Sequence, residues 1–441
     1  MSDRPNVVLI SVDSLRADHL GCYGYHHPTS PRLDQLAAEG ALCERVFCPG
    51  LPTQPSHTTL YTGQHPITHG IVAHGGKAKL SKSAPFLPEI FMQNGYGTCA
   101  VDTLVRERIW FTRGYEYIID PGIRHAFYAS VTVEELNERA IRWMRTAPTG
   151  PFFLFIHYWD VHYPYVPPER YNDLFYEGSP TDPDNHQLDP WWTHPIGAMA
   201  RDTWLRTSSG DRITDPRYVR ALYDREIRYF DDGLGQLLGA LEDLDLEENT
   251  IVVLLSDHGE SMTEHGIFFD HYGLYDSTLR VPLLVRWPAR IPGGTRFPGM
   301  LQMSDVAPTL LEAVGLPAPG DMEGRSFFRM LAGEEARGGH ECIMSAESTW
   351  QAKWSLRTDD MKFILSREPD LLGNPLRELY DLKADPGETR NLAEADHTLT
   401  SELEARLEGW IADRLRALER TEDPVRVEGA SMLGTWKRHR A

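Results

Sequence analysis

The sequence predicts an α/β protein: a large mixed, mostly parallel sheet sandwiched by helices, with a smaller C-terminal α+β subdomain. Three observations support this prediction. Apolar runs that suit strands alternate with helical segments as far as about residue 290. Several of these runs are apolar at nearly every position, which is typical of strands that are buried on both faces. After about residue 330, short strand-like segments follow one another before a single long helix.

The elements of the first part can be justified in chain order. The run 6–12 is continuously apolar, and it is followed by a segment with Ser30 as helix cap, Pro31 near the first helical position and Gly40 as a stop. Thr53 begins a later helix that Gly63 ends. The expected strands are 6–12, 41–47, 97–102, 151–157, 250–256 and 280–287, and the expected helices are 30–40, 53–63, 84–94, 133–144 and 218–243.

The chain divides at changes of composition. We expect a catalytic domain over residues 1–332, interrupted at about 167–216 by an insertion rich in Pro, Asp, Gly and Trp. This insertion is either a packed surface excursion or a substrate-shaping lid. Residues 333–424 form the α+β subdomain, and 425–441 form a basic tail.

The net charge is −20, which argues against nonspecific binding to nucleic acid or to an anionic membrane. No run approaches the roughly 18 apolar residues of a membrane span. The five cysteines are sparse and lack paired-ligand spacing, so they indicate free thiols and a cytoplasmic location. The expected partner is a small anionic ester. The sequence does not decide whether the protein forms a homo-oligomer.

Two acidic positions follow buried strands. Asp13 comes after the first strand, and Asp257-His258 comes after the strand at 250–256. Because the carboxyl ends of strands line the ligand crevice of an open α/β sheet, these side chains are expected to meet there. A carboxylate together with a neutral imidazole suits Zn or Mn, whereas carboxylates alone also suit Ca or Mg. Asp13 alone is more often a turn or cap residue, but the constellation indicates a metal site.

Thr53 is the candidate nucleophile. Direct metal coordination favours its alkoxide, and the helix that begins there offers backbone N–H groups to an anion. His162 and His271 each follow an expected strand end, and either can protonate a leaving oxygen. Other histidines expected near the substrate are His57, His157 and His265.

Several motifs resemble those of the sulfatase family in the alkaline phosphatase superfamily. The resemblance implies that Asp13, Thr53, Asp257 and His258 bind a divalent ion (Mn, Zn or Ca, one or two), that Thr53 is the nucleophile, and that His162 and His271 contact the transferred or leaving group. The matching segments are 12–24, 53–63, 223–232, 256–260, 270–276, 280–283, 378–382, 385–388 and 391–392.

The departures from the family pattern bear on the function. The family's nucleophile is a Cys or Ser that is oxidised to formylglycine, whereas Thr53 is not a substrate for that oxidation. His57 replaces the motif arginine, and Ser14 stands where many members have a second acidic ligand. Superfamily members with an unmodified Thr act on phosphorus esters.

The sequence therefore favours a metal-dependent hydrolase of phosphate or phosphonate mono- or diesters, acting through Thr53. The main alternative is a sulfuric ester hydrolase that works without formylglycine. Further alternatives are a phospho-group transferase and a catalytically silent protein that keeps the metal pocket.

Overall fold

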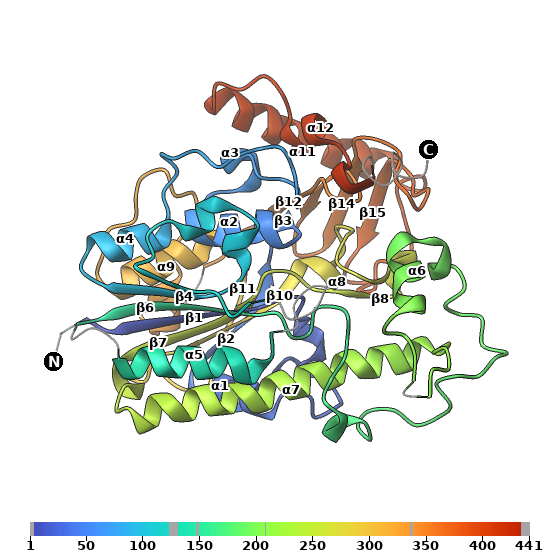
Figure 1. Cartoon of the computed structure of the whole chain (residues 1–441). Helices are drawn as coiled ribbons and strands as arrows, with labels where there is room; N and C mark the ends of the chain where they lie inside the picture. The colour runs from blue at the N-terminus through green and yellow to red at the C-terminus, as the bar shows by residue number, and fades with distance from the viewer. Residues whose placement is uncertain (1–3, 123–130, 147–149, 208, 336–337, 434–441) are drawn as a thin grey trace.

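The computed structural model of the protein contains two large β-sheets that pack against helices, together with a short two-stranded sheet (Figure 1). The structure describes residues 4–122, 131–146, 150–207, 209–335 and 338–433. Helices lie on both faces of the larger sheet, and the smaller sheet lies beside it toward the C-terminus. This arrangement confirms the predicted fold class.

The larger sheet has eight described strands in the order β11-β2-β10-β7-β1-β6-β4-β5. Only β10 runs antiparallel to both of its neighbours, so the sheet is mixed but mostly parallel. The strands are Asn6–Val12 (β1), Ala41–Phe47 (β2), Gly97–Val101 (β4), Tyr117–Ile119 (β5), Phe152–Tyr158 (β6), Thr250–Ser256 (β7), Arg280–Arg286 (β10) and Thr295–Gln302 (β11).

Strand β1 lies in the middle of this sheet and is buried on both faces. Val8 packs in the hydrophobic cluster on one face, and Leu9 packs in the cluster on the other. This is why the run is apolar throughout rather than alternating. One face is covered by α1 (Pro31–Glu39), α5 (Val133–Thr146) and α7 (Pro216–Asp243), and the other by α2 (Thr53–Thr62), α4 (Leu87–Gln93), α9 (Val306–Ala313) and α10 (Phe328–Leu331).

The smaller sheet has the order β15-β14-β13-β12-β3 and is packed against a long C-terminal helix. Its edge strand, β3, comes from the N-terminal part of the chain and pairs in parallel with β12, so the chain passes from β2 of the larger sheet directly into the smaller sheet. The elements are Gly50–Leu51 (β3), Ile343–Glu347 (β12), Lys353–Arg357 (β13), Met361–Ser366 (β14), Arg377–Asp381 (β15) and His397–Ala417 (α11).

The insertion at 167–216 packs against the body of the protein. Its helix α6 (Pro195–Asp202) follows a turn in which Trp191 is buried, with its ring 5.1 Å from that of Phe269. Phe269 belongs to β9 (Phe268–Asp270), which pairs with β8 (Ser261–Met262). The insertion therefore supports the segment that leads to His271.

Residues 425–433, taken above as the start of a basic tail, are packed rather than free. They begin inside helix α12 (Pro424–Glu428), and Val425 is fully buried in the core of the smaller sheet. The remainder of that segment, 434–441, lies outside the described residues. The five cysteines are all free, and none of the helices in the described ranges has both the length and the apolar character of a membrane span.

Candidate functional site

The carboxylates of the site meet because of the pairing between β1 and β7. In this parallel pair Val12 lies opposite Ser256, so the residues that follow, Asp13 and Asp257, leave the sheet side by side. The His258 Nε2 atom lies 3.7 Å from Asp13 Oδ1 and 3.3 Å from Asp257 Oδ2. All three side chains are buried.

Thr53 joins this group from the first position of α2. Its Oγ1 atom lies 3.3 Å from His258 Nε2. The helix is held in place by Ser56, whose hydroxyl donates to the Asp257 carbonyl at 2.5 Å, and every residue of α2 is buried. The hydroxyl of Thr53, the positive end of the helix dipole and the carboxylates therefore face one another.

The imidazole of His258 has a defined proton position. Its Nδ1 atom lies 3.0 Å from the Gly259 carbonyl, so Nδ1 carries the hydrogen and Nε2 presents a lone pair to the carboxylates and Thr53. Gly259 is required there, because a Cβ atom would lie 2.0 Å from the backbone oxygen of Ser277. Burial lowers the pKa of His258, which keeps the ring neutral.

This set of donors fits a metal ion. Asp13 Oδ2 and Asp257 Oδ2 are buried and have no hydrogen-bond partner among the described residues. Ligand atoms of Asp13, Asp257 and His258 lie within 4.8 Å of one another. Unpartnered carboxylate oxygens are costly in a protein interior, and a divalent cation satisfies them.

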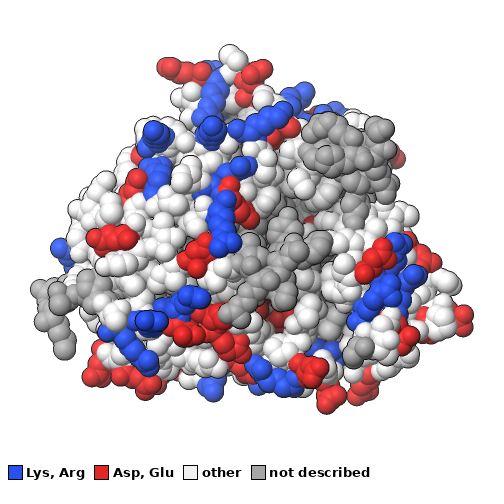
Figure 2. All heavy atoms as spheres, in the orientation of Figure 1, with Lys and Arg blue, Asp and Glu red and all other residues white. Residues whose placement is uncertain are grey.

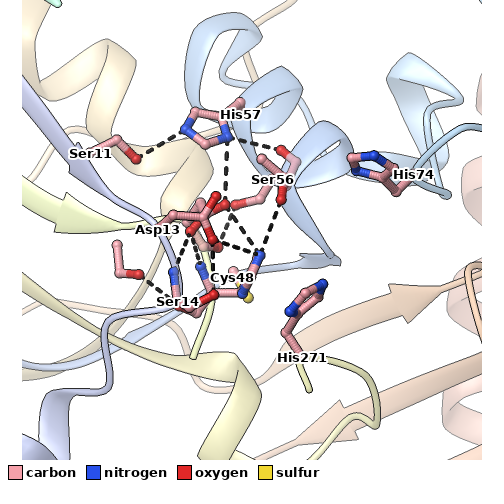
Figure 3. Close-up of polar contacts among 12 residues, drawn as sticks. Ser11, Asp13, Ser14, Cys48, Ser56, His57, His74 and His271 are labelled. Carbon is pink, nitrogen blue, oxygen red and sulfur yellow. Dashed lines mark hydrogen bonds and ion pairs between the residues drawn. The ribbon is translucent and has the colours of Figure 1, made fainter. Parts of the chain in front are cut away.

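Ser14 supports the carboxylates instead of adding a third one. Its hydroxyl donates to Asp13 Oδ1 at 2.9 Å, and its backbone N–H donates to Asp257 Oδ1 at 3.2 Å. The residue adopts a left-handed conformation with φ of 60°. Figure 3 shows Ser14 directly beside Asp13.

His157 lies beneath the site and links Asp13 to Asp102. Its Nδ1 atom donates to Asp102 Oδ1 at 3.0 Å, and Nε2 lies 3.5 Å from Asp13 Oδ2. Burial alone lowers the pKa of His157, but the two carboxylates outweigh it and raise the pKa to about 10. The protonated ring therefore holds Asp13. Asp102 was not selected in the sequence analysis, although it follows β4 at the same sheet edge.

His57 also lies in the floor of the site. Its Nδ1–H donates to the Thr53 carbonyl at 2.9 Å, and its Nε2 accepts from the Ser11 hydroxyl at 3.0 Å (Figure 3). Burial and the nearby His157 lower the pKa of His57 well below its usual range. With His157 and Asp257, His57 forms a second group within metal-ligand distance, but both of its ring nitrogens are already hydrogen-bonded.

His162 and His271 lie beside each other and next to His258. Their ring centroids are 5.0 Å apart, and the His271 ring is stacked on His258 at 4.6 Å. Burial, with contributions from neighbouring histidines, lowers the pKa of both. His271 keeps a little exposure, and its Nδ1 lies 3.7 Å from both Glu260 Oε1 and Asp270 Oδ1.

His265 does not join the group. The β8–β9 hairpin turns it away, so that its ring is stacked on Tyr275 at 3.6 Å. It lines a separate cavity of about 430 Å³ together with Arg16 and Asp18. Spacing along the chain did not reveal this turn, because it depends on the left-handed conformation of His265 itself, with φ of 57°.

The buried carboxylates of Glu260 and Asp270 were also not predicted. Neither Glu260 oxygen has a hydrogen-bond partner among the described residues, and the same holds for Asp270 Oδ2. Burial raises the pKa of both side chains, that of Asp270 to about 8. The motif that contains Asp257 and His258 ends at Glu260, which is the only sequence signal that pointed to it.

Known proteins resemble this chain over most of its length. A sulfatase from Formosa agariphila is 26% identical over 89% of this chain and 83% of its own length. Iduronate 2-sulfatase of Mus musculus is 27% identical over 86% of this chain and 77% of its own length. The solved structure of a phosphonate monoester hydrolase from Agrobacterium radiobacter has a TM-score of 0.73 at 22% identity, covering 93% of this chain and 96% of its own.

Family comparison agrees with the site geometry. Residues 263–413 match the C-terminal region described for N-sulphoglucosamine sulphohydrolase. Residues 5–316 match the family described as Sulfatase, and this stretch contains Asp13, Thr53, Asp257 and His258. The protein is thus an ester-hydrolysing enzyme, and the chain belongs to the sulfatase family.

Proposed function

We propose that the protein hydrolyses small organic esters of a sulfur or phosphorus oxyacid, with Thr53 as the nucleophile. One observation carries this proposal: the Thr53 hydroxyl lies 3.3 Å from the unprotonated nitrogen of His258, beside two buried carboxylates with unpartnered oxygens. Asp13, Thr53, Asp257 and His258 would hold a divalent ion, which when bound lowers the pKa of the Thr53 hydroxyl and neutralises charge on the ester.

The residues then have separate roles. Thr53 Oγ1 attacks the sulfur or phosphorus atom, and its new bond forms as the bond to the leaving oxygen breaks. The lowered pKa leaves the His271 ring neutral, so it takes up the proton released from the Thr53 hydroxyl and gives that proton to the leaving oxygen. His271 is assigned this role because it is more exposed than His162. Water then cleaves the ester on Thr53, releases the inorganic oxyanion and restores the hydroxyl. His157 and Ser14 keep Asp13 oriented throughout.

The ion proposed for this site is a single Zn or Mn. Its ligands are two carboxylates, one hydroxyl and one imidazole nitrogen, and the imidazole favours these ions over Ca. A second ion is not proposed, because the bonds from His57 to Thr53 and Ser11 use both of its ring nitrogens.

Sulfate esters are the first candidate substrates. The curated relatives named above are sulfatases that match most of this chain, which supports sulfur more strongly than the sequence analysis did. Phosphonate and phosphate esters are the second candidate. They are favoured by Thr53, which is not the formylglycine precursor, and by the structural similarity to a phosphonate monoester hydrolase.

An ester panel tests the proposal. Wild type, Thr53→Ser and Thr53→Ala are compared on aryl sulfate, aryl phosphonate monoester, aryl phosphate and aryl phosphodiester, with the bound metal measured in each protein. We expect Thr53→Ala to lower kcat by more than about 10³-fold on the best ester, while Thr53→Ser keeps measurable turnover. Wild-type rates for Thr53→Ala would exclude the nucleophile. No turnover of any ester, with no bound metal, would support a catalytically silent protein.

A further inference from the structure

Lysine is scarce in this chain and unevenly placed. The sequence has seven lysines, and three of them, Lys77, Lys79 and Lys82, lie within six residues. This segment belongs to the connection between α3 (Pro66–His69) and α4. Figure 2 shows Lys and Arg side chains on the part of this face that lies over α2 and α4 in Figure 1. In a chain with a net charge of −20, a local group of cations needs an explanation.

These three lysines line a cavity of about 640 Å³, called here the lysine pocket. Its charged lining consists of five cations and two carboxylates, which gives 5 − 2 = +3. The lining residues with charged side chains are Lys77, Lys79, Lys82, Arg108, Arg113, Glu89 and Glu107.

The cations of the pocket are not neutralised like those elsewhere in the protein. Lys353, Lys362 and Lys383 each lie within 3.1 Å of a carboxylate. In the described ranges, no carboxylate lies within ion-pair distance of the three lysines of the pocket. Arg108 likewise donates to neutral oxygens, those of the Gln54 side chain at 3.0 Å and the Gly76 carbonyl at 2.8 Å. Only Arg113 is paired, with Glu89.

The pocket is joined directly to the nucleophile. Gln54 follows Thr53 in α2, and its side-chain amide donates to Glu107 at 2.9 Å while its oxygen accepts from Arg108 and from the Gly75 backbone N–H. Trp110, which lines the pocket, donates to Thr58 of the same helix at 3.3 Å. The wall of the lysine pocket is therefore hydrogen-bonded to α2, at the residue next to Thr53.

Part of the lining is apolar. Leu80 and Trp110 are largely buried, the Arg108 guanidinium lies 5.6 Å from the centre of the Trp110 ring, and Ile109 is 79% exposed. A free inorganic anion makes no use of such a surface, whereas an organic group that carries an anionic substituent matches both the apolar part and the cationic rim.

We propose that the lysine pocket binds a second anionic group on the organic part of the ester, so that the preferred substrates carry a sulfate, phosphate or carboxylate besides the ester that is cleaved. This inference rests on the proposed function, since it places the cleaved ester at Thr53. The lysines would contact the second anion, and Arg108 would add fixed positive charge in the wall.

The test uses Lys77→Gln/Lys79→Gln/Lys82→Gln. Its matched control is Arg142→Gln/Arg145→Gln/Lys383→Gln, which removes the same number of exposed cations elsewhere and changes the net charge equally. The best ester from the panel is measured as a phenyl ester and as the same ester with a carboxylate, sulfonate or phosphonate on the ring. We expect wild type and control to prefer the doubly anionic esters by about tenfold in kcat/KM, and the pocket variant to lose that preference while keeping its rate on the plain phenyl ester. The three substituents distinguish the kinds of second anion.

A binding measurement separates failure of this inference from failure of the proposed function. Naphthalene-1,5-disulfonate is an aromatic dianion without an ester, and its binding is measured by isothermal titration calorimetry. We expect the affinity to fall about tenfold in the pocket variant and to stay unchanged in the control. If no ester is turned over but this difference is found, the pocket is an anion site and the hydrolase proposal fails. Equal affinity for the disulfonate in all three proteins would contradict the proposal that the lysine pocket binds a second anion. So would a pocket variant that still prefers doubly anionic esters.

Discussion

Asp13 receives its orientation from the residue that follows it and from a residue on a neighbouring strand. Ser14 binds one carboxylate oxygen, and His157 faces the other from the neighbouring strand β6. Burial raises the pKa of Asp13, but His162 and His157 outweigh it and hold the pKa well below its usual range. Asp13 is therefore ionised at neutral pH, as a metal ligand must be.

His271 is the residue for which the leaving group gives the sharpest test. If it protonates the leaving oxygen, its loss matters most where that oxygen is a poor leaving group. We expect His271→Gln to lower kcat/KM about 10²-fold on an alkyl ester and less than about tenfold on a para-nitrophenyl ester. The measurement is the rate of both esters in wild type, His271→Gln and His162→Gln.

The comparison with His162 is the control, because His162 donates from Nδ1 to the Tyr163 carbonyl at 2.5 Å. An equal loss on both esters in His271→Gln would assign it to positioning. A loss confined to poor leaving groups in His162→Gln would transfer the role of acid to that residue.

The helices and strands that could be predicted from the sequence are those whose own residues carry a local pattern, such as an apolar run or a helix cap. Strand β1 is apolar throughout, and α7 begins after Asp215, whose side chain accepts from the Arg217 N–H. Strand β3 has two residues, and only its pairing with β12 makes it a strand. Asp102 and Ser11 were missed for the same reason: their partners His157 and His57 are distant in the sequence, so only folding shows the contacts.

Helix α3 offers a prediction about pH, because its cap, His65, connects it to β12. His65 Nε2 donates to the Met344 carbonyl at 3.0 Å, and Nδ1 accepts from the Ile67 N–H at 3.3 Å. The bond from the Ile67 N–H requires an unprotonated Nδ1 and hence the neutral ring, and burial lowers the pKa of His65 to about 4. Because the folded pKa is below the unfolded value of 6.5, this contribution to stability is complete above pH 6.5 and is lost as the pH falls toward 4.

The expected size follows from the two pKa values. Between pH 7 and pH 5, wild type should lose about 2 kcal/mol more in the free energy of unfolding than His65→Gln does. Urea unfolding at both pH values measures this difference. The control is His186→Gln, which removes an imidazole that is 73% exposed. Parallel pH dependence of wild type and His65→Gln would show that His65 does not carry the effect.

At the scale of the whole molecule, the two sheets act as one unit around the site. Strand β3 belongs to the smaller sheet and leads directly to Thr53, and Gly273, near His271, donates to Glu347 of β12 at 2.8 Å. The catalytic group therefore depends on contacts that cross from one sheet to the other. The composition change near residue 330 marked where the smaller sheet begins but carried no sign of this connection.

A substitution of Lys362 in β14 tests whether the two sheets unfold together, because this side chain is fully buried between α8 of the larger part and the C-terminal part. Its Nζ atom lies 2.5 Å from Asp276 of α8 (Asp276–Leu279) and 2.7 Å from Glu388 of the C-terminal part. In Lys362→Met, Asp276 keeps Arg357, whereas the Glu388 carboxylate loses its cation in a buried position. We expect the free energy of unfolding to fall by about 3 kcal/mol.

The matched control is Lys383→Met, in which an exposed pair with Asp360 is lost at a cost within about 0.5 kcal/mol. Urea unfolding followed by tryptophan fluorescence and by ester hydrolysis should give one coincident transition that shifts in Lys362→Met alone. Two separated transitions, or equal shifts in the two variants, would show that the smaller sheet unfolds independently of the site.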